Sequence, residues 1–352
     1  MPHVRPILYL CEPDYLLPMK PTAEWQDVDV DKFRNEIYRH DRPAVFRGLV
    51  KDWPAVREGR KSPQALCDYI KSFDLGRQIQ TAVGPPEIKG RLFYNDGVDG
   101  FNYERIHEKF QDAIARILTN LDNSAPPAIY AGAVSTAEGF PGFAKENTLP
   151  LVNPAVVSRI WAGNAVTAPT HYDMSDNIAC VVAGHRRCTF FPPDQLPNLY
   201  VGPIEFTPAG QPTSMVKVGA PDLVRYPRYA QALAAAETTD LGPGDAVFIP
   251  NMWWHNIESL DPFNILVNYW WYDGPRGPGA PFTALVYGIL SLRELPANRR
   301  EIWRRMFDHY VFQTNGDPVE HLPPERRGML GRLTRQVVGA AKAWLQNELQ
   351  RL

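Results

Sequence analysis

Three residues of this sequence have the types and spacing of a metal site: His171, Asp173 and His255. His171 and Asp173 are two residues apart, so on an extended chain their side chains project from one face. His255 is expected on a distant strand, framed by a Gly-Pro-Gly-Asp turn, an apolar run and two tryptophans. Two histidines and one carboxylate leave positions open on an octahedral ion, as in non-haem Fe(II) oxygenases. A His-x-Asp pair alone is common on surfaces, so the prediction depends on all three residues.

The residues around these candidates form short apolar runs separated by turns, which indicates strands. The candidate strands are Ala128–Ala133, Val156–Ala162, Ile178–Ala183, Arg187–Phe191, Ala246–Ile249 and Asn264–Trp271. This density of short strands favours an antiparallel sandwich or barrel over alternating strands and helices. A long Pro- and Gly-rich connection over 192–242, with one expected helix near 226–236, is typical of a functional lid or an ordered decoration.

The flanking regions have helical spacing, and the first third is expected to be helical with one strand. Its expected elements are a short helix after Asp29 or Asp31, a strand over 42–49, a helix from Pro63 and a helix over 110–121. After Gly274 the chain is expected to be helical again, with an apolar stripe from Leu330 to Leu349. The sequence therefore predicts an N-terminal elaboration (1–127), a β-rich catalytic core (128–274) and a C-terminal helical region (275–352).

Composition narrows the classes of function. The chain has 37 basic and 39 acidic residues, which gives no electrostatic footprint for nucleic acid or anionic lipid. Its longest apolar runs are strand-sized, far below the roughly 20 residues of a membrane-spanning helix. The N-terminal apolar run is too short for a signal peptide. Four cysteines without CxxC spacing, Cys11, Cys67, Cys180 and Cys188, favour reduced thiols in a cytoplasmic protein.

Three long segments, in the same order along the chain, resemble the cupin-like JmjC-type hydroxylases. They are residues 42–54 (RPAVFRGLVKDWP), residues 171–195 with HYD and GHRRCTFFPPDQ, and residues 242–270 with GPGD, WWHNIESL and VNYW. The resemblance implies a mainly β fold with helical additions, built on a double-stranded β-helix (jelly-roll) core. It also implies Fe(II), 2-oxoglutarate as co-substrate and O₂, with His171, Asp173 and His255 as iron ligands.

The resemblance also assigns residues to the co-substrate carboxylate. Arg186 stands where the family has a lysine, and a guanidinium can bind a carboxylate bidentately. Strand parity places Arg186 on the inner face and Arg187 on the outer face. Tyr130 matches the tyrosine that hydrogen-bonds this carboxylate. The family's threonine is replaced by Ala168, and Thr167 is the nearest candidate for the missing hydroxyl, although Thr170 is also close.

Two amides and one indole match residues that line the family's iron site: Asn177, Asn268 and Trp270. A buried amide must find hydrogen-bond partners, and each of these amides could also satisfy a strand end. Trp270 shares the strand face of Asn268 and is expected to form a pocket wall.

The leading hypothesis is an Fe(II)- and 2-oxoglutarate-dependent dioxygenase that hydroxylates a polypeptide side chain or a small molecule. A non-redox metal-binding cupin, either an isomerase or a ligand-binding module, is the alternative. Such cupins typically use His-x-His followed by Glu, and the sequence contains no His-x-His. A degenerate peptide-binding protein is a third possibility, which the intact triad disfavours. The apolar C-terminal stripe predicts a homodimer, since apolar patches mark interfaces.

Overall fold

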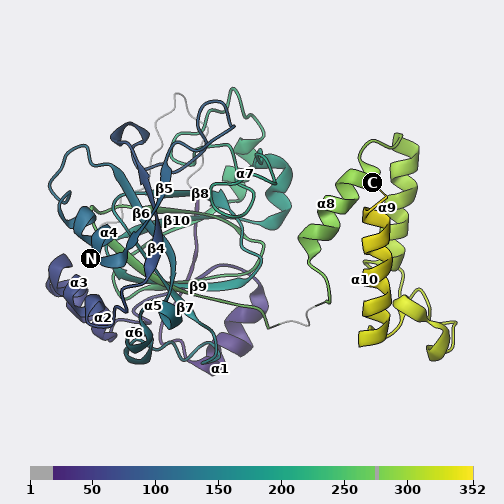
Figure 1. Cartoon of the computed structure of the whole chain (residues 1–352), viewed down its shortest axis with the longest axis horizontal. Coiled ribbons are helices and arrows are strands. Elements are labelled where there is room, and N and C mark those ends of the chain that lie inside the picture. Colours follow the sequence, from purple (N-terminus) through teal and green to yellow (C-terminus); the bar gives the residue numbers. More distant parts are fainter. Residues whose placement is uncertain (1–18, 274–276, 352) are drawn as a thin grey trace. The chain divides into compact units, whose positions relative to one another are not determined.

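The computed structural model describes residues 19–273 and 277–351 (Figure 1). The chain divides into two compact units, residues 1–272 and 273–352. The N-terminal apolar run and Cys11 lie outside the described residues. Cys67, Cys180 and Cys188 are buried free thiols, as the cysteine spacing predicts.

The larger unit is built from two mainly antiparallel sheets, which confirms the mainly β prediction. In spatial order, the five-stranded sheet contains β1 (Lys20–Pro21), β11 (Glu237–Leu241), β10 (Arg186–Phe191), β13 (Trp254–Ser259) and β8 (Thr167–His171). The nine-stranded sheet contains β2 (Ala23–Trp25), β3 (Ala44–Phe46), β12 (Ala246–Ile249), β9 (Asp176–Ala183), β14 (Asn264–Trp271), β7 (Ser158–Gly163), β6 (Ala128–Ser135), β4 (Gln78–Gly84) and β5 (Glu104–Lys109).

The core follows from residue alternation along the strands. Val181 of β9, Phe190 of β10 and Val247 of β12 belong to one apolar cluster shared by the two sheets. Cys180 and Val182 of β9 belong to the larger cluster on the opposite face of the nine-stranded sheet. β9 is therefore buried along its whole length, and its near-continuous apolar sequence reflects two buried faces.

Helices cover the outer face of the nine-stranded sheet and contribute to the larger cluster. The helices of this unit before residue 192 are α1 (Val30–Lys32), the π-helix Phe33–Ile37, the 3₁₀ turns Tyr38–His40 and Pro86–Ile88, α2 (Pro54–Lys61), α3 (Pro63–Lys71), α4 (Phe110–Leu118), α5 (Thr136–Gly139) and α6 (Pro141–Glu146). Two of these helices have side-chain caps where the sequence places their starts: Asp29 accepts from the Lys32 amide at 2.8 Å, and Ser62 accepts from the Ala65 amide at 3.0 Å.

The first third holds more strands than the one predicted: the two- and three-residue strands β1 and β2 were missed, and so were the longer strands β4 and β5. Their residues alternate between a core face and a polar face, and the polar face carries side chains such as Gln80 and Arg105. A polar strand of this kind at the edge of a sheet lacks the apolar signal on which the prediction depended. Both strands extend the sheet beyond β6, so this region widens the β core itself.

The connection over 192–242 is ordered. It contains the 3₁₀ helix Pro193–Asn198, α7 (Tyr229–Ala235) and β11. Leu199 and Tyr229 pack with Tyr172 and Trp254 in a separate apolar cluster. The connection is therefore attached to the strands that carry the candidate metal ligands.

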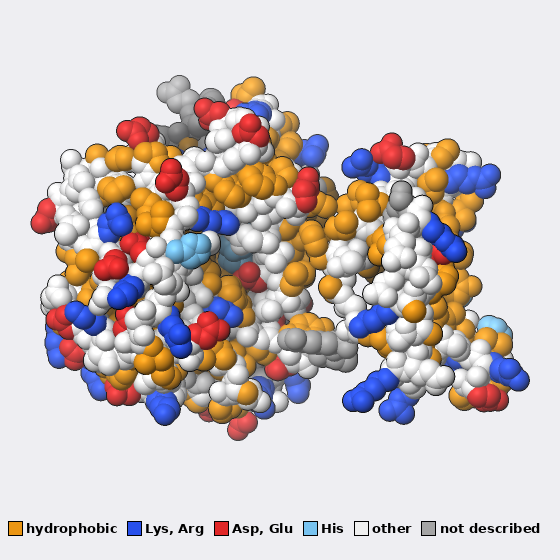
Figure 2. Space-filling view, viewed as in Figure 1, with side chains coloured by type: hydrophobic (Ala, Val, Ile, Leu, Met, Phe, Trp, Pro, Cys, Tyr) orange, Lys and Arg blue, Asp and Glu red, His pale blue; other side chains and the backbone are white. Residues whose placement is uncertain are grey.

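The C-terminal unit is helical, as predicted, with α8 (Pro281–Leu292), α9 (Ala297–Tyr310), two 3₁₀ turns (Pro324–Arg326 and Gly328–Leu330) and α10 (Arg335–Leu349). The predicted stripe is not one helix, because α10 begins at Arg335 after the Thr334 cap, and Leu330 and Leu333 precede it. None of these three helices buries a residue, and hydrophobic side chains lie exposed on this unit (Figure 2). Among the described helices, none is long and apolar enough to cross a membrane.

Candidate metal centre and its pocket

His171, Asp173 and His255 converge at one end of the jelly-roll. His171 ends β8 and lies opposite His255 of β13 in the strand register. The two ring centroids are 4.4 Å apart, and the His255 Nε2 lies 3.7 Å from the Asp173 Oδ2. One ligand atom from each of the three side chains lies within 4.8 Å of the others. The group is compact enough to hold one metal ion.

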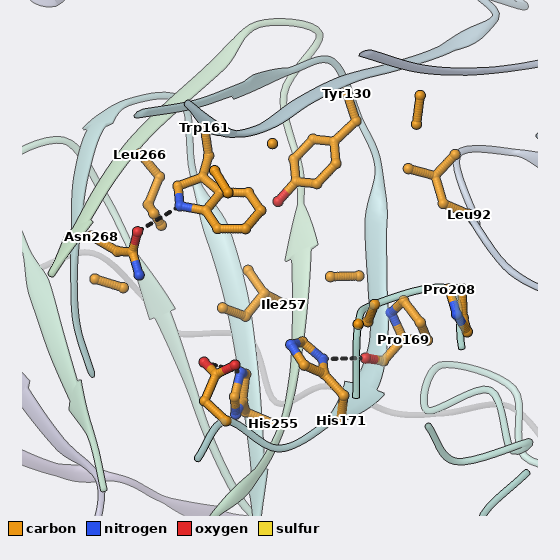
Figure 3. Close-up of a pocket in the computed structure, with 18 of the residues that line it drawn as sticks. Leu92, Tyr130, Trp161, Pro169, His171, Pro208, His255, Ile257, Leu266 and Asn268 are labelled. Atoms are coloured by element: carbon orange, nitrogen blue, oxygen red, sulfur yellow. Dashed lines mark hydrogen bonds and ion pairs between the residues drawn. The ribbon is translucent and has the colours of Figure 1, made fainter. Parts of the chain in front are cut away.

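The tautomer of each histidine is fixed by a backbone carbonyl. The Nδ1 of His171 donates to the Pro169 carbonyl at 2.7 Å (Figure 3). The Nδ1 of His255 donates to the Trp253 carbonyl at 3.0 Å. The proton therefore sits on Nδ1, and Nε2 keeps its lone pair for a metal. Burial, together with neighbouring His171, lowers the pKa of His255 to about 4, so this ring is neutral at pH 7.

The Asp173 carboxylate is oriented by an indole. The Nε1 of Trp270 donates to the Asp173 Oδ2 at 3.0 Å, and the backbone amide of Met252 donates to the Asp173 carbonyl at 2.8 Å. A hydrogen bond to a ligating carboxylate fixes its rotamer and its free lone pairs. Trp270 therefore positions Asp173, in addition to lining the pocket.

Arg186 is a buried cation in the same pocket. Its side chain is 2% exposed, and its Nη1 donates to the Ser259 Oγ at 2.8 Å. Its Nε and Nη2 have no hydrogen-bond partner among the described residues. These two nitrogens form the edge of a guanidinium that binds a carboxylate bidentately. A buried cation with two unpartnered nitrogens on one edge fits the distal carboxylate of 2-oxoglutarate. The neighbouring Arg187 faces outward and pairs with Asp240.

Tyr130 directs its hydroxyl into the same space (Figure 3). Burial raises the pKa of Tyr130 to about 12, although the cation of Arg186 opposes that shift. The phenol therefore stays protonated at pH 7 and can donate a hydrogen bond to an anion. Arg186 and Tyr130 together form a pocket end suited to one carboxylate.

Thr167 does not line the pocket, and a β-bulge explains why. His255 pairs with His171, but Ile257 pairs with Ala168, so β8 has one residue more than β13 over this stretch. The bulge turns both His171 and Ala168 towards the pocket and leaves Thr167 facing away. The hydroxyl that partners Arg186 is instead that of Ser259, directly opposite it in the β10–β13 register. The sequence contained one signal for Ser259. It lies two residues after Ile257, so on an extended strand both side chains project from the same face.

A chain of polar groups forms the wall beside the triad. The Nε1 of Trp161 donates to the Asn268 Oδ1 at 2.7 Å, and the Asn268 Nδ2 donates to the Asn177 Oδ1 at 3.1 Å. Both amides are buried and line the pocket, as does Trp161. The amides are thus fixed in orientation and can present polar atoms to a substrate.

The pocket has a volume of about 370 Å³ and extends outward from the triad. Its mouth is formed by Gln80 and Ala82 of β4, by Arg105 of β5, and by residues 208–210 of the long connection. The sequence reasoning missed Gln80 and Arg105. Gln80 had a weak signal, the polar–apolar–polar run of residues 78–80, which matches a strand with one solvated face.

Comparisons with known proteins support the same architecture. A family model described as the cupin-like domain matches residues 30–277. Human HSPB1-associated protein 1 is 29% identical over 285 residues, which cover 74% of this chain and 52% of the relative. Lysine-specific demethylase JMJ31 of Arabidopsis thaliana is 35% identical over 275 residues, covering 68% of this chain and 47% of the relative.

A third relative is matched over most of both chains. The tRNA wybutosine-synthesizing protein 5 of Danio rerio is 32% identical over 309 residues, covering 80% of this chain and 89% of the relative. The chain spans only about half the length of the first two relatives. The family match includes all three triad residues and both sheets of the site, which confirms the jelly-roll prediction. The chain belongs to the cupin-like family of JmjC-type domain proteins.

Proposed function

We propose that this chain is an Fe(II)- and 2-oxoglutarate-dependent dioxygenase that hydroxylates a polypeptide side chain. The observation that carries this proposal concerns Arg186, whose Nε and Nη2 have no hydrogen-bond partner among the described residues. This guanidinium lies in the same pocket as the His171, Asp173 and His255 triad. A metal site alone would suit many cupins. A buried guanidinium beside a metal site supports a small acid as co-substrate, because a buried charge needs an opposite charge or hydrogen-bond acceptors.

The roles of the chain's residues follow from their contacts. Bound iron supplies the oxygen activation and hydrogen abstraction of this reaction class. The Nε2 atoms of His171 and His255 and the carboxylate of Asp173 hold the ion, while Trp270 keeps the carboxylate oriented. Arg186 binds the distal carboxylate of 2-oxoglutarate, with a hydrogen bond from Tyr130. Apolar residues of the pocket wall keep water away from the reacting atoms.

The proposed acceptor is a polypeptide. The pocket mouth opens between a polar sheet face and the 208–210 loop, and the fixed amides of Asn177 and Asn268 can orient a polar side chain. The names of the relatives point to other acceptors, a lysine in one case and a tRNA nucleoside in another. A small metabolite is a further alternative, since the cavity is in the size range of small-molecule sites.

The test is succinate release by the full chain with Fe(II) and 2-oxoglutarate. The proposal predicts iron-dependent succinate, which rises when a protein fraction is added. Release that depends only on a fraction below about 1 kDa and survives protease treatment would show a metabolite acceptor. Absence of succinate with every fraction, in the presence of tight metal binding, would favour a non-redox cupin.

We also propose a homodimer formed through the C-terminal unit. Its helices expose large apolar side chains, for example Leu290 (67%), Trp344 (59%) and Leu285 (52%). Helices of this length need a packed apolar face to be stable, and a second copy supplies an identical one. Light scattering at micromolar concentration should give twice the chain mass of 39.8 kDa, and Leu290→Glu with Trp344→Glu should reduce it. A monomer for the unsubstituted chain would contradict the dimer.

A further inference from the structure

Strand β5 carries three basic residues on the pocket side of its sheet: Arg105, His107 and Lys109, here called the basic row. In the β4–β5 register, Arg105 lies opposite Ala82, and His107 lies opposite Gln80. Directly opposed residues of an antiparallel pair project from the same face. Since Ala82 and Gln80 line the pocket, the basic row continues the pocket wall outward.

Charge is segregated across this strand. Glu104 and Glu108 alternate with the basic row and project from the other face, where Glu108 pairs with Arg116 of α4 at 3.1 Å. All three members of the basic row are exposed, and none forms an ion pair with a carboxylate in the part of the chain that the structure describes. The pocket face of β5 therefore presents two uncompensated cations, Arg105 and Lys109, with the imidazole of His107 between them.

Arg105, the member nearest the pocket, is held in place. Its guanidinium donates to the Tyr103 hydroxyl at 3.0 Å and to the Pro208 carbonyl at 3.1 Å, and it lies 5.2 Å from the centre of the Phe101 ring. These contacts use neutral partners, so the positive charge remains available to an anion. Arg105 also connects β5 to the loop that forms the other side of the mouth.

We propose that the basic row binds acidic side chains, at alternate positions, of an extended polypeptide substrate. This inference rests on the proposed function and specifies its substrate class. Same-face residues of an extended chain recur about every 6.7 Å, which matches the spacing of the row itself. Residues 1–272 hold 25 basic and 31 acidic residues, a net charge of −6, so a polyanion such as nucleic acid would be repelled beyond the row.

The experiment uses the full chain and two labelled twelve-residue peptides, one with Glu and one with Gln at every second position and Thr between them. Fluorescence anisotropy measures both dissociation constants at low and high salt. The Glu peptide should bind about tenfold more tightly at low salt, since the exposed ion pairs with Arg105 and Lys109 each contribute modestly and the imidazole of His107 adds a hydrogen-bond donor. High salt should remove the difference.

The test variant is Arg105→Gln, His107→Gln, Lys109→Gln, which should lose the preference for Glu. The control variant is Arg57→Gln, Lys71→Gln, Lys145→Gln, which removes three exposed basic residues from α2, α3 and α6 and should keep the preference. Equal binding of the two peptides by the unsubstituted chain would overturn the proposal. So would a preference that survives in the test variant or disappears in the control.

A twelve-nucleotide oligothymidylate is the second probe. Tighter binding of this probe than of the Glu peptide, with loss in the test variant, would assign the row to nucleic acid and overturn the polypeptide. Succinate release by the unsubstituted chain without peptide tests the proposed function separately. Succinate without a Glu preference refutes only the basic row, whereas a Glu preference without succinate refutes only the dioxygenase.

Discussion

The two ends of the pocket are built differently. At the closed end, Arg186 and His255 are each 2% exposed, and strand register places them. At the open end, Arg105 and Gln80 are exposed, and the last two strands of the sheet, β5 and β4, place them beside a loop. The closed end therefore fixes groups that a reaction needs at set positions, and the open end presents groups that a substrate can select.

This difference predicts how substitutions divide. Substitutions at the closed end should weaken the binding of the metal ion and of the co-substrate, because each buried group there is positioned for one specific contact. Changes at the open end should affect only the affinity for the acceptor, because exposed pairs are weak and screened by salt. The predictions below test this division.

The largest effect is expected at the triad. His171→Ala, Asp173→Ala or His255→Ala should each abolish Fe(II)-dependent succinate release, because two remaining ligands hold the ion weakly. Circular dichroism should show that the chain stays folded. Full turnover by Asp173→Ala would contradict the metal assignment.

A smaller loss is expected at Trp270. Trp270→Phe keeps the ring but removes the hydrogen bond to the Asp173 Oδ2. Loss of such an outer partner typically weakens metal affinity about 10- to 100-fold. Titration with Fe(II), or with Mn(II) as a redox-inert substitute, measures the change. An affinity equal to that of the unsubstituted chain would mean that Asp173 needs no orienting partner.

Substitutions of the two adjacent arginines of β10 should differ about tenfold in their effect on the 2-oxoglutarate requirement. Arg186→Ala should raise the 2-oxoglutarate requirement at least tenfold, since a charge-assisted bidentate contact contributes about 1.5–3 kcal/mol. Arg187→Ala, which removes a half-exposed pair with Asp240, should change it little. The reverse ranking would place the co-substrate outside this pocket.

The smallest effect on the 2-oxoglutarate requirement is expected when the hydroxyl of Tyr130 or of Thr167 is removed. Tyr130→Phe removes one neutral hydrogen bond to the carboxylate and should raise the 2-oxoglutarate requirement about three- to tenfold. Thr167→Val should leave it within twofold, because the bulge in β8 turns Thr167 away from the pocket. Steady-state kinetics with varied 2-oxoglutarate separates the two variants, and a larger effect of Thr167→Val would contradict the observed register.

The sequence predicted the elements that carry strong apolar patterns. The strands over 246–249 and 264–271 were placed with the observed bounds, and the three triad residues were identified from their types. The resemblance then supplied the jelly-roll and the role of Arg186. Strand parity sufficed to place Arg186 inside and Arg187 outside, because β10 contains no bulge within the β10–β13 pairing.

What the sequence did not predict depends on tertiary pairing. The extra residue of β8 is visible only against β13, so the sequence left Thr167 and Thr170 as candidates for the hydroxyl, whereas Ser259 contacts Arg186. Strands β4 and β5 were missed because one face of each is polar, and that face forms the open end of the pocket. The polar face that suits these strands to bind a substrate also weakens the apolar pattern from which strands are predicted.

The central claim is that the triad and Arg186 hold a metal ion and 2-oxoglutarate in one pocket. Calorimetric titration of 2-oxoglutarate into the Mn(II)-loaded chain tests it without turnover. We expect binding that requires the metal, is absent in Asp173→Ala and is at least tenfold weaker in Arg186→Ala. Binding of equal strength without metal, or binding unchanged in Arg186→Ala, would contradict it.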